Sequence, residues 1–451
     1  MQLFPKDFLW GAATSSFQIE GAFNEDGKSL SNWDMFCRVP GAVNNGDTGD
    51  VACDHYHRWK EDVAIMKKLG LKTYRFSISW PRVLPDGIGA VNKKGIEFYD
   101  RLIDALIEAG IEPMITLFHW DMPQSMQDMG GWLNPEVVDA FENYAKVCFK
   151  KFGKKVKKWA TFNEAWVFTI MAYTGNHQPP IGLNSHTLLG LKASHGVNLA
   201  HAKAVRAYRE MGFKGEIGIV QVTASVEPLD AKNPPVEKMK TLDGIMNRWF
   251  LDPFYKGAYP EDILKYYAQQ YGAKFTPDKK EVKFIGEMGS DFIGVNYYFP
   301  FRVRENGKNK PFTWHGCVGA PDGAKRSHMG WEIYPEGIYN IIMKFKREYD
   351  NPVLYITENG NAFEDKKIVK GVVIDDDRID YVKNHLLQIR RAINDGARVK
   401  GYYQWSLMDN FEWTHGYSKR FGIVRVDYKT LKRTIKKSGR WYAGVIKDNG
   451  V

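Results

Sequence analysis

The chain has 451 residues, of which 44% are hydrophobic and 26% charged, a composition typical of a soluble globular protein. Its formal net charge of +10 comes mainly from dispersed cations. The densest basic run, residues 150–158, fits a solvated helix end better than a nucleic-acid site, since no nucleic-acid-binding motif accompanies it. No stretch approaches 18 consecutive apolar residues, so the sequence predicts neither a membrane span nor a membrane partner.

The four cysteines show no Cys-x-x-Cys spacing, and a chain of this length does not need a disulfide framework. The N-terminal "MQLFPKDFLWGAA" lacks the basic segment and apolar run of a signal peptide. We therefore expect reduced cysteines and a cytoplasmic location. Because no His/Cys cluster has metal-ligand spacing, we interpret His55 and His57 as structural residues near a helix start and expect no metal.

Eight short apolar runs recur along the chain, and helical sequence follows them. The runs cover residues 8–14, 73–79, 112–118, 157–163, 216–222, 291–297, 353–359 and 400–406. Three clear amphipathic helices are expected at 95–110, 134–153 and 377–396. Repeated strand–helix units predict a parallel sheet that closes into a single (β/α)₈ TIM barrel over residues 1–451. A doubly wound open sheet is the alternative, but the first strand–helix turn has no G-x-G-x-x-G motif.

Large polar and aromatic side chains gather where these apolar runs stop. They are Gln18 and Glu20 after the first run, Arg75 in the second, His119, Trp120 and Asp121 after the third, Asn163 and Glu164 at the fourth, Asn296, Tyr297 and Tyr298 at the sixth, Glu358 and Asn359 in the seventh, and Gln404, Trp405, Glu412 and Trp413 at or after the eighth. In a barrel, the carboxyl ends of the strands form the active-site face. Helix caps and turns need fewer such groups, so we expect an active site there.

Two of these ends match each other, "WATFNEAW" around Glu164 and "YITENGNA" around Glu358. Two carboxylates facing one pocket indicate hydrolysis of a glycosidic bond. One donates a proton to the leaving oxygen, and the other attacks or activates water. Close spacing of the two carboxylates would give retention of configuration, and wide spacing would give inversion. The sequence leaves the distance between them open.

Electrostatics would separate the two roles. Arg75 is the candidate cation that keeps Glu358 ionised, while burial and the ionised neighbour raise the pKa of Glu164. Glu164 would then donate a proton near neutral pH. It would act as a base on water once Glu358 carries the sugar.

The other strand-end groups suit a sugar. Several can hydrogen-bond ring hydroxyls, namely Gln18, His119, Asn163, Glu412 and Trp413. Trp405 offers a flat face to the sugar ring, and Trp166 and Trp331 are candidates for contacts with the leaving group.

The motifs together resemble family-1 glycoside hydrolases, the β-glucosidase/β-galactosidase group, over nearly the whole chain. The resemblance rests on "FLWGAATSSFQIEGA", "TFNEAW", "YITENG" and "WSLMDNFEW…GYSKRFGIVRVDY". It implies a retaining exo-β-glycosidase without a cofactor, with Glu164 as acid/base and Glu358 as nucleophile. The expected substrates carry a terminal β-glucosyl unit, and β-galactosyl and β-fucosyl units are further candidates. It also implies that Tyr298 positions Glu358 and that Asn296 supports the site. The expected partners are small β-glycosides and short β-linked oligosaccharides, and the oligomeric state is left open. To the sugar contacts we add Trp120 and Phe421, and to the leaving-group side His177.

The sequence departs from the family pattern on the expected leaving-group side. Ala165 stands where the family usually has proline, "GNHQPPIG" replaces a His-Ala-Pro-Gly-like stretch, and Val222 stands where asparagine is common. A 6-phospho-β-glucosidase is an alternative, but Glu412 would repel a phosphate dianion. A catalytically silent sugar-binding barrel is another, and the presence of both glutamates argues against it. The sequence does not predict the conformation of the loop at 304–331.

Overall fold

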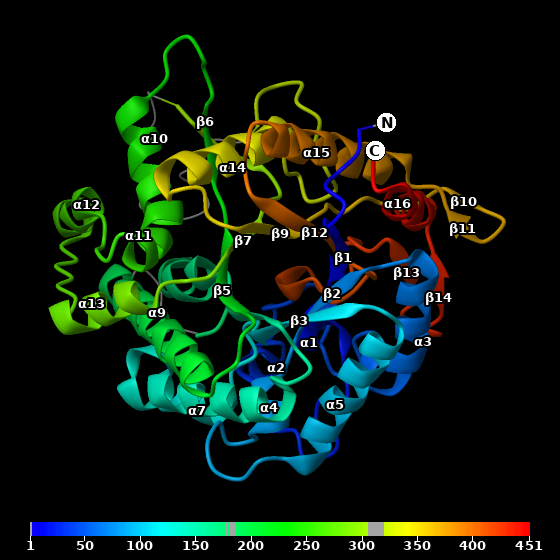
Figure 1. The fold of residues 1–451 in the computed structure, drawn as a ribbon, viewed down its shortest axis with the longest axis horizontal. Coiled ribbons are helices and arrows are strands. Elements are labelled where there is room, and N and C mark those ends of the chain that lie inside the picture. Colours follow the sequence, from blue (N-terminus) through cyan, green and yellow to red (C-terminus); the bar gives the residue numbers. More distant parts are fainter. Residues whose placement is uncertain (1, 176–177, 181–185, 305–319) are drawn as a thin grey trace.

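A closed barrel of parallel strands lies at the centre of the molecule, and helices surround it (Figure 1). The structure is a computed structural model that describes residues 2–175, 178–180, 186–304 and 320–451. The two described ends of the chain meet beside the barrel, where the backbone of Gln2 hydrogen-bonds that of Val451.

Eight strands form the barrel, in the order β1-β12-β9-β7-β5-β4-β3-β2. They are β1 (Leu9–Ala13), β2 (Thr73–Ser77), β3 (Glu112–Phe118), β4 (Lys158–Asn163), β5 (Glu216–Val222), β7 (Ile293–Asn296), β9 (Leu354–Asn359) and β12 (Val399–Trp405). Each lies within a predicted apolar run or within one residue of it. The predicted (β/α)₈ barrel is therefore confirmed, and the open doubly wound alternative is wrong because β1 pairs with both β2 and β12.

The longer helices lie outside the barrel between consecutive strands (Figure 1). They are α3 (His55–Leu69), α5 (Lys93–Glu108), α7 (Pro135–Phe152), α9 (Thr187–Glu210), α10 (Val236–Asp243), α11 (Trp249–Tyr255), α12 (Glu261–Tyr271), α13 (Lys279–Met288), α14 (Glu336–Glu348), α15 (Asp376–Asn394) and α16 (Lys437–Asp448). Shorter helices lie in the connections: α1 (Ser16–Ile19), α2 (Asn32–Phe36), α4 (Trp80–Val83), α6 (Gln124–Asp128) and α8 (Ala172–Gly175).

Helix α7 shows why the sequence could predict such boundaries. The Asn134 side chain accepts a hydrogen bond from the Glu136 backbone, Pro135 takes the first helical position, and Gly153 ends the helix. The helix thus matches the expected range of 134–153 closely. Helices α5 and α15 also agree with their predicted ranges to within two residues at each end.

Six short strands were not predicted, because two- to four-residue pairs leave little periodic pattern in a sequence. They pair as β6 (Ser225–Pro228) with β8 (Pro300–Val303), β10 (Ile368–Val369) with β11 (Val372–Val373), and β13 (Val424–Val426) with β14 (Arg433–Ile435). The β13–β14 hairpin lies against the segment that follows β12, where a backbone bridge joins Met408 to Val424. This hairpin therefore contacts the segment that leads from β12 to Glu412.

The barrel interior is a packed core. Small and large side chains both fill it, including Ala13, Met114, Ala160, Val220 and Tyr403. A larger apolar layer fills the space between strands and helices. Because the interior is full, ligands can reach only the mouth of the barrel.

The described part of the chain contains no helix with the length and apolar character needed to cross a bilayer. Nor do its His, Cys, Asp and Glu side chains form a group of three able to hold a metal ion. His55 hydrogen-bonds Asp62 and His57 contacts Asp54, which agrees with the structural interpretation of both histidines.

Candidate active site

Glu164 leaves the end of β4 through an unusual backbone conformation. Its φ is +56°, a left-handed value that is uncommon for a residue other than glycine. The Glu164 backbone N–H donates to the Val220 carbonyl of β5 at 2.8 Å. The hydrogen bond fixes the turn, and the side chain lines the cavity at the barrel mouth. Backbone strain of this kind is concentrated at functional sites.

Glu358 lies in β9, and both of its carboxylate oxygens accept hydrogen bonds. Arg75 of β2 donates to Oε1 at 2.7 Å, and the Tyr298 hydroxyl donates to Oε2 at 2.5 Å. The Arg75 guanidinium is fully buried and also donates to the Thr357 carbonyl. The predicted pairing of Arg75 with Glu358 is thus present in the structure.

Asn296 and Asn163 join the two glutamates into one network. Asn296 Nδ2 donates to Glu164 Oε1 at 2.8 Å and to Asn163 Oδ1 at 3.0 Å. Asn163 Oδ1 also accepts from Arg75 at 2.7 Å. This double acceptance identifies the Asn163 oxygen and leaves its amide nitrogen as a donor, which contacts His119 Nε2 at 3.1 Å.

The surroundings hold a proton on Glu164. Burial, followed by the charge of Glu358, raises the pKa of Glu164 to about 8. A hydrogen bond from Asn296 and the charge of Arg75 oppose this rise without cancelling it. At neutral pH Glu164 is therefore protonated and able to act as an acid.

Glu358 differs from the expectation in one respect. Burial raises the pKa of Glu358 above its usual value even though Arg75 and Tyr298 both lower it. The cation therefore limits the effect of burial but does not reverse it. Glu412 shows the same effect without a cation: burial, and then the charge of Glu358, raise the pKa of Glu412 to about 8.

An aromatic cluster lines part of the cavity beside this network. The His119 ring lies nearly parallel to Trp405 and to Trp413, at centroid distances of 5.9 and 6.0 Å. Trp120 packs on Trp413 at 4.3 Å. Burial, followed by the charge of Arg75, lowers the pKa of His119 well below its usual value, so the ring is neutral. Its Nε2 accepts from Asn163, so Nδ1 carries the proton, and this buried Nδ1 has no partner in the described structure.

These groups surround a cavity of about 330 Å³. Eleven of the residues predicted from sequence line it: His119, Trp120, Asn163, Glu164, Tyr298, Trp331, Glu358, Trp405, Glu412, Trp413 and Phe421. Arg75 and Asn296 are not in the lining but bond directly to residues that are.

The lining also contains residues that the sequence analysis did not select. They are Trp33, Val167, Met171, Gln178, Phe299, Met329, Thr414 and His415, together with Val222, noted only as a departure from the family pattern. Most of these side chains are apolar, and such residues are usually core. Only Val167, Phe299, Thr414 and His415 directly follow "NEAW", "NYY" and "FEW" and could have been indicated by those motifs.

Several strand-end residues lie elsewhere. Gln18 is not in the cavity lining, because its amide bonds Ser15, Asn410 and the Phe411 carbonyl, and its contact with a sugar hydroxyl stays a prediction. Trp166 is 4% exposed within the apolar layer and is also absent from the lining, so its placement gives no support for a leaving-group contact. His177 lies outside the described residues.

Glu20 and Asp121 also turn away from the mouth, although both follow predicted strands. Glu20 forms an ion pair with Arg82 at 2.9 Å, and Asp121 accepts from the Ser16 hydroxyl. Position after a strand was therefore not sufficient to place a side chain in the site.

Comparisons with known proteins identify the family of the chain. The sequence model of glycosyl hydrolase family 1 matches residues 1–451. Beta-glucosidase A of Thermotoga maritima is 47% identical over 450 residues, covering 99% of this chain and 98% of the relative. Beta-glucosidase A of Acetivibrio thermocellus is 46% identical over 451 residues, covering 99% of each chain. The structure of the Thermotoga maritima beta-glucosidase in complex with deoxynojirimycin superposes with a TM-score of 0.92 at 46% identity, covering all of both chains.

The architecture, the paired glutamates at the ends of β4 and β9, and a match along the full sequence agree with one another. The chain belongs to glycosyl hydrolase family 1 and is a glycoside hydrolase.

Proposed function

We propose that the protein is a retaining exo-β-glycosidase that releases terminal β-D-glucosyl residues, with residues 1–451 acting as one catalytic domain. The observation that carries the proposal is the difference between the two glutamates. Glu358 has a cation and a hydroxyl on its carboxylate, whereas Glu164 is protonated and receives its hydrogen bond from an uncharged amide. The glucosyl preference is supported by the names of the similar proteins, which are beta-glucosidases.

The reaction proceeds in two displacements. The Glu358 carboxylate attacks the anomeric carbon, the glycosidic C–O bond breaks, and the Glu164 proton passes to the leaving oxygen. The resulting ester has no charge, so the electrostatic cause of part of the raised Glu164 pKa disappears. Glu164 then takes a proton from water, which attacks the anomeric carbon and releases Glu358.

The sugar contacts follow from the lining. His119 lines the cavity with a neutral ring, and Asn163 has an amide N–H besides the one directed to His119. An amide beside the acid suits the sugar 2-hydroxyl, where contacts strengthen in the transition state. Trp405 supplies the apolar face, and Glu412 with Trp413 supplies polar groups for the remaining hydroxyls.

The leaving-group side accepts β-glycosides with apolar aglycones as well as short β-linked oligosaccharides. Val167, Met171, Val222, Phe299 and Met329 all line the cavity and offer no charge. Trp331 packs against Phe299 at 4.8 Å and extends this apolar surface. An apolar lining binds an aryl or alkyl group by burial and requires few directed hydrogen bonds.

A 6-phospho-β-glucosidase is the second candidate, and the structure changes the argument against it. With a pKa of about 8, Glu412 is largely protonated at neutral pH, so its charge gives only weak repulsion of phosphate. A stronger argument is that the described cavity lining holds no lysine or arginine. A phosphate dianion buried without a cation would be strongly disfavoured.

The cytoplasm is the proposed compartment. Cys37, Cys53 and Cys148, the cysteines that the structure describes, are all free and buried, which suits a reducing environment.

A substrate panel tests the proposal. The protein is offered 4-nitrophenyl β-glucoside, β-galactoside, β-fucoside and 6-phospho-β-glucoside, and a Glu358→Gln variant serves as the control. We expect the highest kcat/KM on the glucoside and almost no turnover by the variant. Turnover of the phosphorylated substrate alone would overturn the substrate assignment. An active variant would contradict the role of Glu358, and a wild type inactive on all four substrates would indicate a silent sugar-binding barrel.

Proton NMR of the first product tests the stereochemistry separately. Retention yields β-glucose, which then mutarotates. A first product of α-glucose would contradict the nucleophilic role of Glu358.

A further inference from the structure

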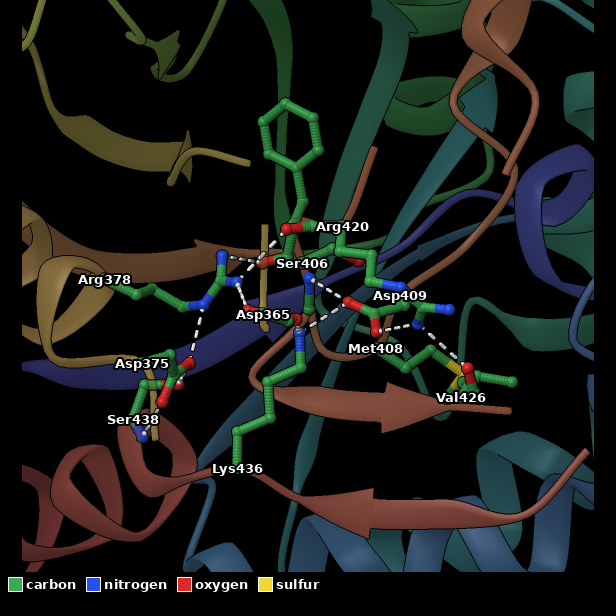
Figure 2. Close-up of polar contacts among 12 residues, drawn as sticks. Asp365, Asp375, Arg378, Ser406, Met408, Asp409, Arg420, Val426, Lys436 and Ser438 are labelled. Carbon is green, nitrogen blue, oxygen red and sulfur yellow. Dashed lines mark hydrogen bonds and ion pairs between the residues drawn. The ribbon is translucent and has the colours of Figure 1, made fainter. Parts of the chain in front are cut away.

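A buried network of ionic side chains lies beside the barrel mouth and takes no part in the chemistry above (Figure 2). It balances three carboxylates against three cations. The members are Asp365, Asp375, Asp409, Arg378, Arg420 and Lys436, and every side chain except that of Arg420 is at most 1% exposed.

Arg378 of α15 uses all five N–H donors of its guanidinium. Its Nε donates to Asp375 at 2.8 Å, and one Nη donates to Asp365 at 2.9 Å and to the Arg420 carbonyl at 3.2 Å. The other Nη donates to the carbonyl of Asn361 at 2.6 Å and to that of Phe421 at 3.2 Å. One rigid group therefore holds the segment after β9 together with the segment at Phe421.

Asp409 is the second junction. Its Oδ1 accepts from Lys436 at 2.7 Å and from the Gly422 backbone at 3.0 Å, and its Oδ2 accepts from Arg420 at 2.6 Å. Lys436 also contacts Asp365, which closes the connection back to Arg378 (Figure 2). The backbones approach so closely that a Cβ on Gly422 would lie 2.1 Å from the Asp409 nitrogen.

The segments held by this network carry the sugar-binding surface. Asn361 follows Glu358 by three residues, Glu412 follows Asp409 by three, and Phe421 is itself part of the cavity lining. Arg378 and Lys436 both reach Asp365 of the first segment, while Asp409 and Arg420 belong to the second. The relative position of Glu358 and Glu412 thus depends on these contacts.

A buried ionic network is an expensive way to gain stability. Apolar residues of similar volume are often as stable or more stable, although removal of one partner from an existing network is strongly destabilising. What a network adds is fixed geometry, because each donor and acceptor requires one arrangement.

We infer that Asp409 and Arg378 are positioning residues that hold Glu412 and Phe421 in register with Glu358, so that the network sets glycone recognition. This inference rests on the proposed function. With Glu412 taken to lie near the sugar 6-position, as in the argument about 6-phosphosugars, damage to the network should weaken discrimination between sugars that differ at the 6-hydroxyl.

The test compares Asp409→Asn with Asp62→Asn. Asp62 is equally buried and bonds Arg433 and His55, but none of these three lines the cavity. For each variant, kcat/KM is measured on 4-nitrophenyl β-glucoside and on its 6-deoxy analogue. The ratio of kcat/KM on the glucoside to kcat/KM on the 6-deoxy analogue does not depend on the fraction of folded enzyme. A loss of stability alone therefore leaves this ratio unchanged.

We expect Asp409→Asn to lower the ratio roughly 10-fold, as for the loss of one hydrogen bond to a charged or strongly polar group, and Asp62→Asn to keep it. An unchanged ratio in Asp409→Asn would overturn the inference. If Asp409→Asn does not fold, Arg378→Lys keeps the charge but cannot make the five contacts, and it should show the same loss. If Arg378→Lys folds and keeps the wild-type ratio, the network has a structural role only. The same conclusion follows if Arg378→Lys does not fold although Asp62→Asn does. Failure of the wild type on both substrates would instead contradict the proposed function.

Discussion

The ends of β4 and β9 carry the same residue in similar sequences, yet they place it in different surroundings. Glu358 accepts hydrogen bonds from Arg75 and Tyr298. Glu164 accepts one from Asn296, and the charge of Glu358 raises its pKa. Both carboxyls are buried, so burial raises both pKa values. The neighbours decide which carboxyl retains its proton, and the comparison teaches that chemical role is a property of the contacts.

The largest expected effect comes from replacing each glutamate in turn. Glu358→Gln should lower kcat on the order of 10⁴-fold or more, because no nucleophile remains. Glu164→Gln should lower it about 10²–10⁴-fold on a poor leaving group. With 2,4-dinitrophenyl β-glucoside, whose leaving group needs no proton, Glu164→Gln should lose much less in the glycosylation step.

Burst kinetics on this substrate measures glycosylation separately. Equal sensitivity of both variants to the leaving group would contradict the assignment of different roles to the two glutamates.

Removal of the Arg75 cation should reduce the electrostatic difference between Glu358 and Glu164. Arg75→Met should raise the Glu358 pKa further and lower kcat/KM at pH 6 by roughly 10²-fold. The reaction needs ionised Glu358, so the acidic limb of the pH profile should move to higher pH. Arg75→Lys keeps the charge and serves as the control. An acidic limb unmoved in Arg75→Met would show that Arg75 does not act on the charge of Glu358.

The pH profile of the unmodified enzyme provides a finer test. Glu164 must be protonated to act as the acid, and its pKa is raised to about 8, so kcat/KM should be retained at neutral pH and fall as pH rises through about 8. The two carboxyls interact, so the apparent values belong to the pair. Persistence of the alkaline limb in Glu164→Gln with an activated substrate would assign that limb to another group, with Glu412 the first candidate.

The smallest expected effect concerns one hydrogen bond. Tyr298→Phe removes the hydroxyl at 2.5 Å from Glu358 Oε2 and leaves the ring contacts with Trp331 and Phe421 possible. We expect a loss of about 10-fold in kcat/KM and a small upward shift of the acidic limb, less than in Arg75→Met. A loss larger than that of Arg75→Met would reverse the ranking of the two contacts.

Much of the barrel could be predicted because its signals are local. Each apolar run is short and bounded, and helix α7 carries its own cap, its first-turn proline and its final glycine. The six short strands lack such patterns and depend on contacts between distant segments. Glu20 and Asp121 show the same limit in the site, since Arg82 and Ser16 draw them away from the mouth.

By itself the sequence determined the strand–helix alternation, the two glutamates and the cation that pairs with one of them. It could do so because hydrophobic periodicity and strand-end position act within a few residues. Only the tertiary structure decided the raised pKa of Glu358, the proton on Glu412, the apolar part of the cavity lining and the network around Asp409 and Arg378. These properties arise from burial and from contacts between segments far apart in the chain, which no local pattern records.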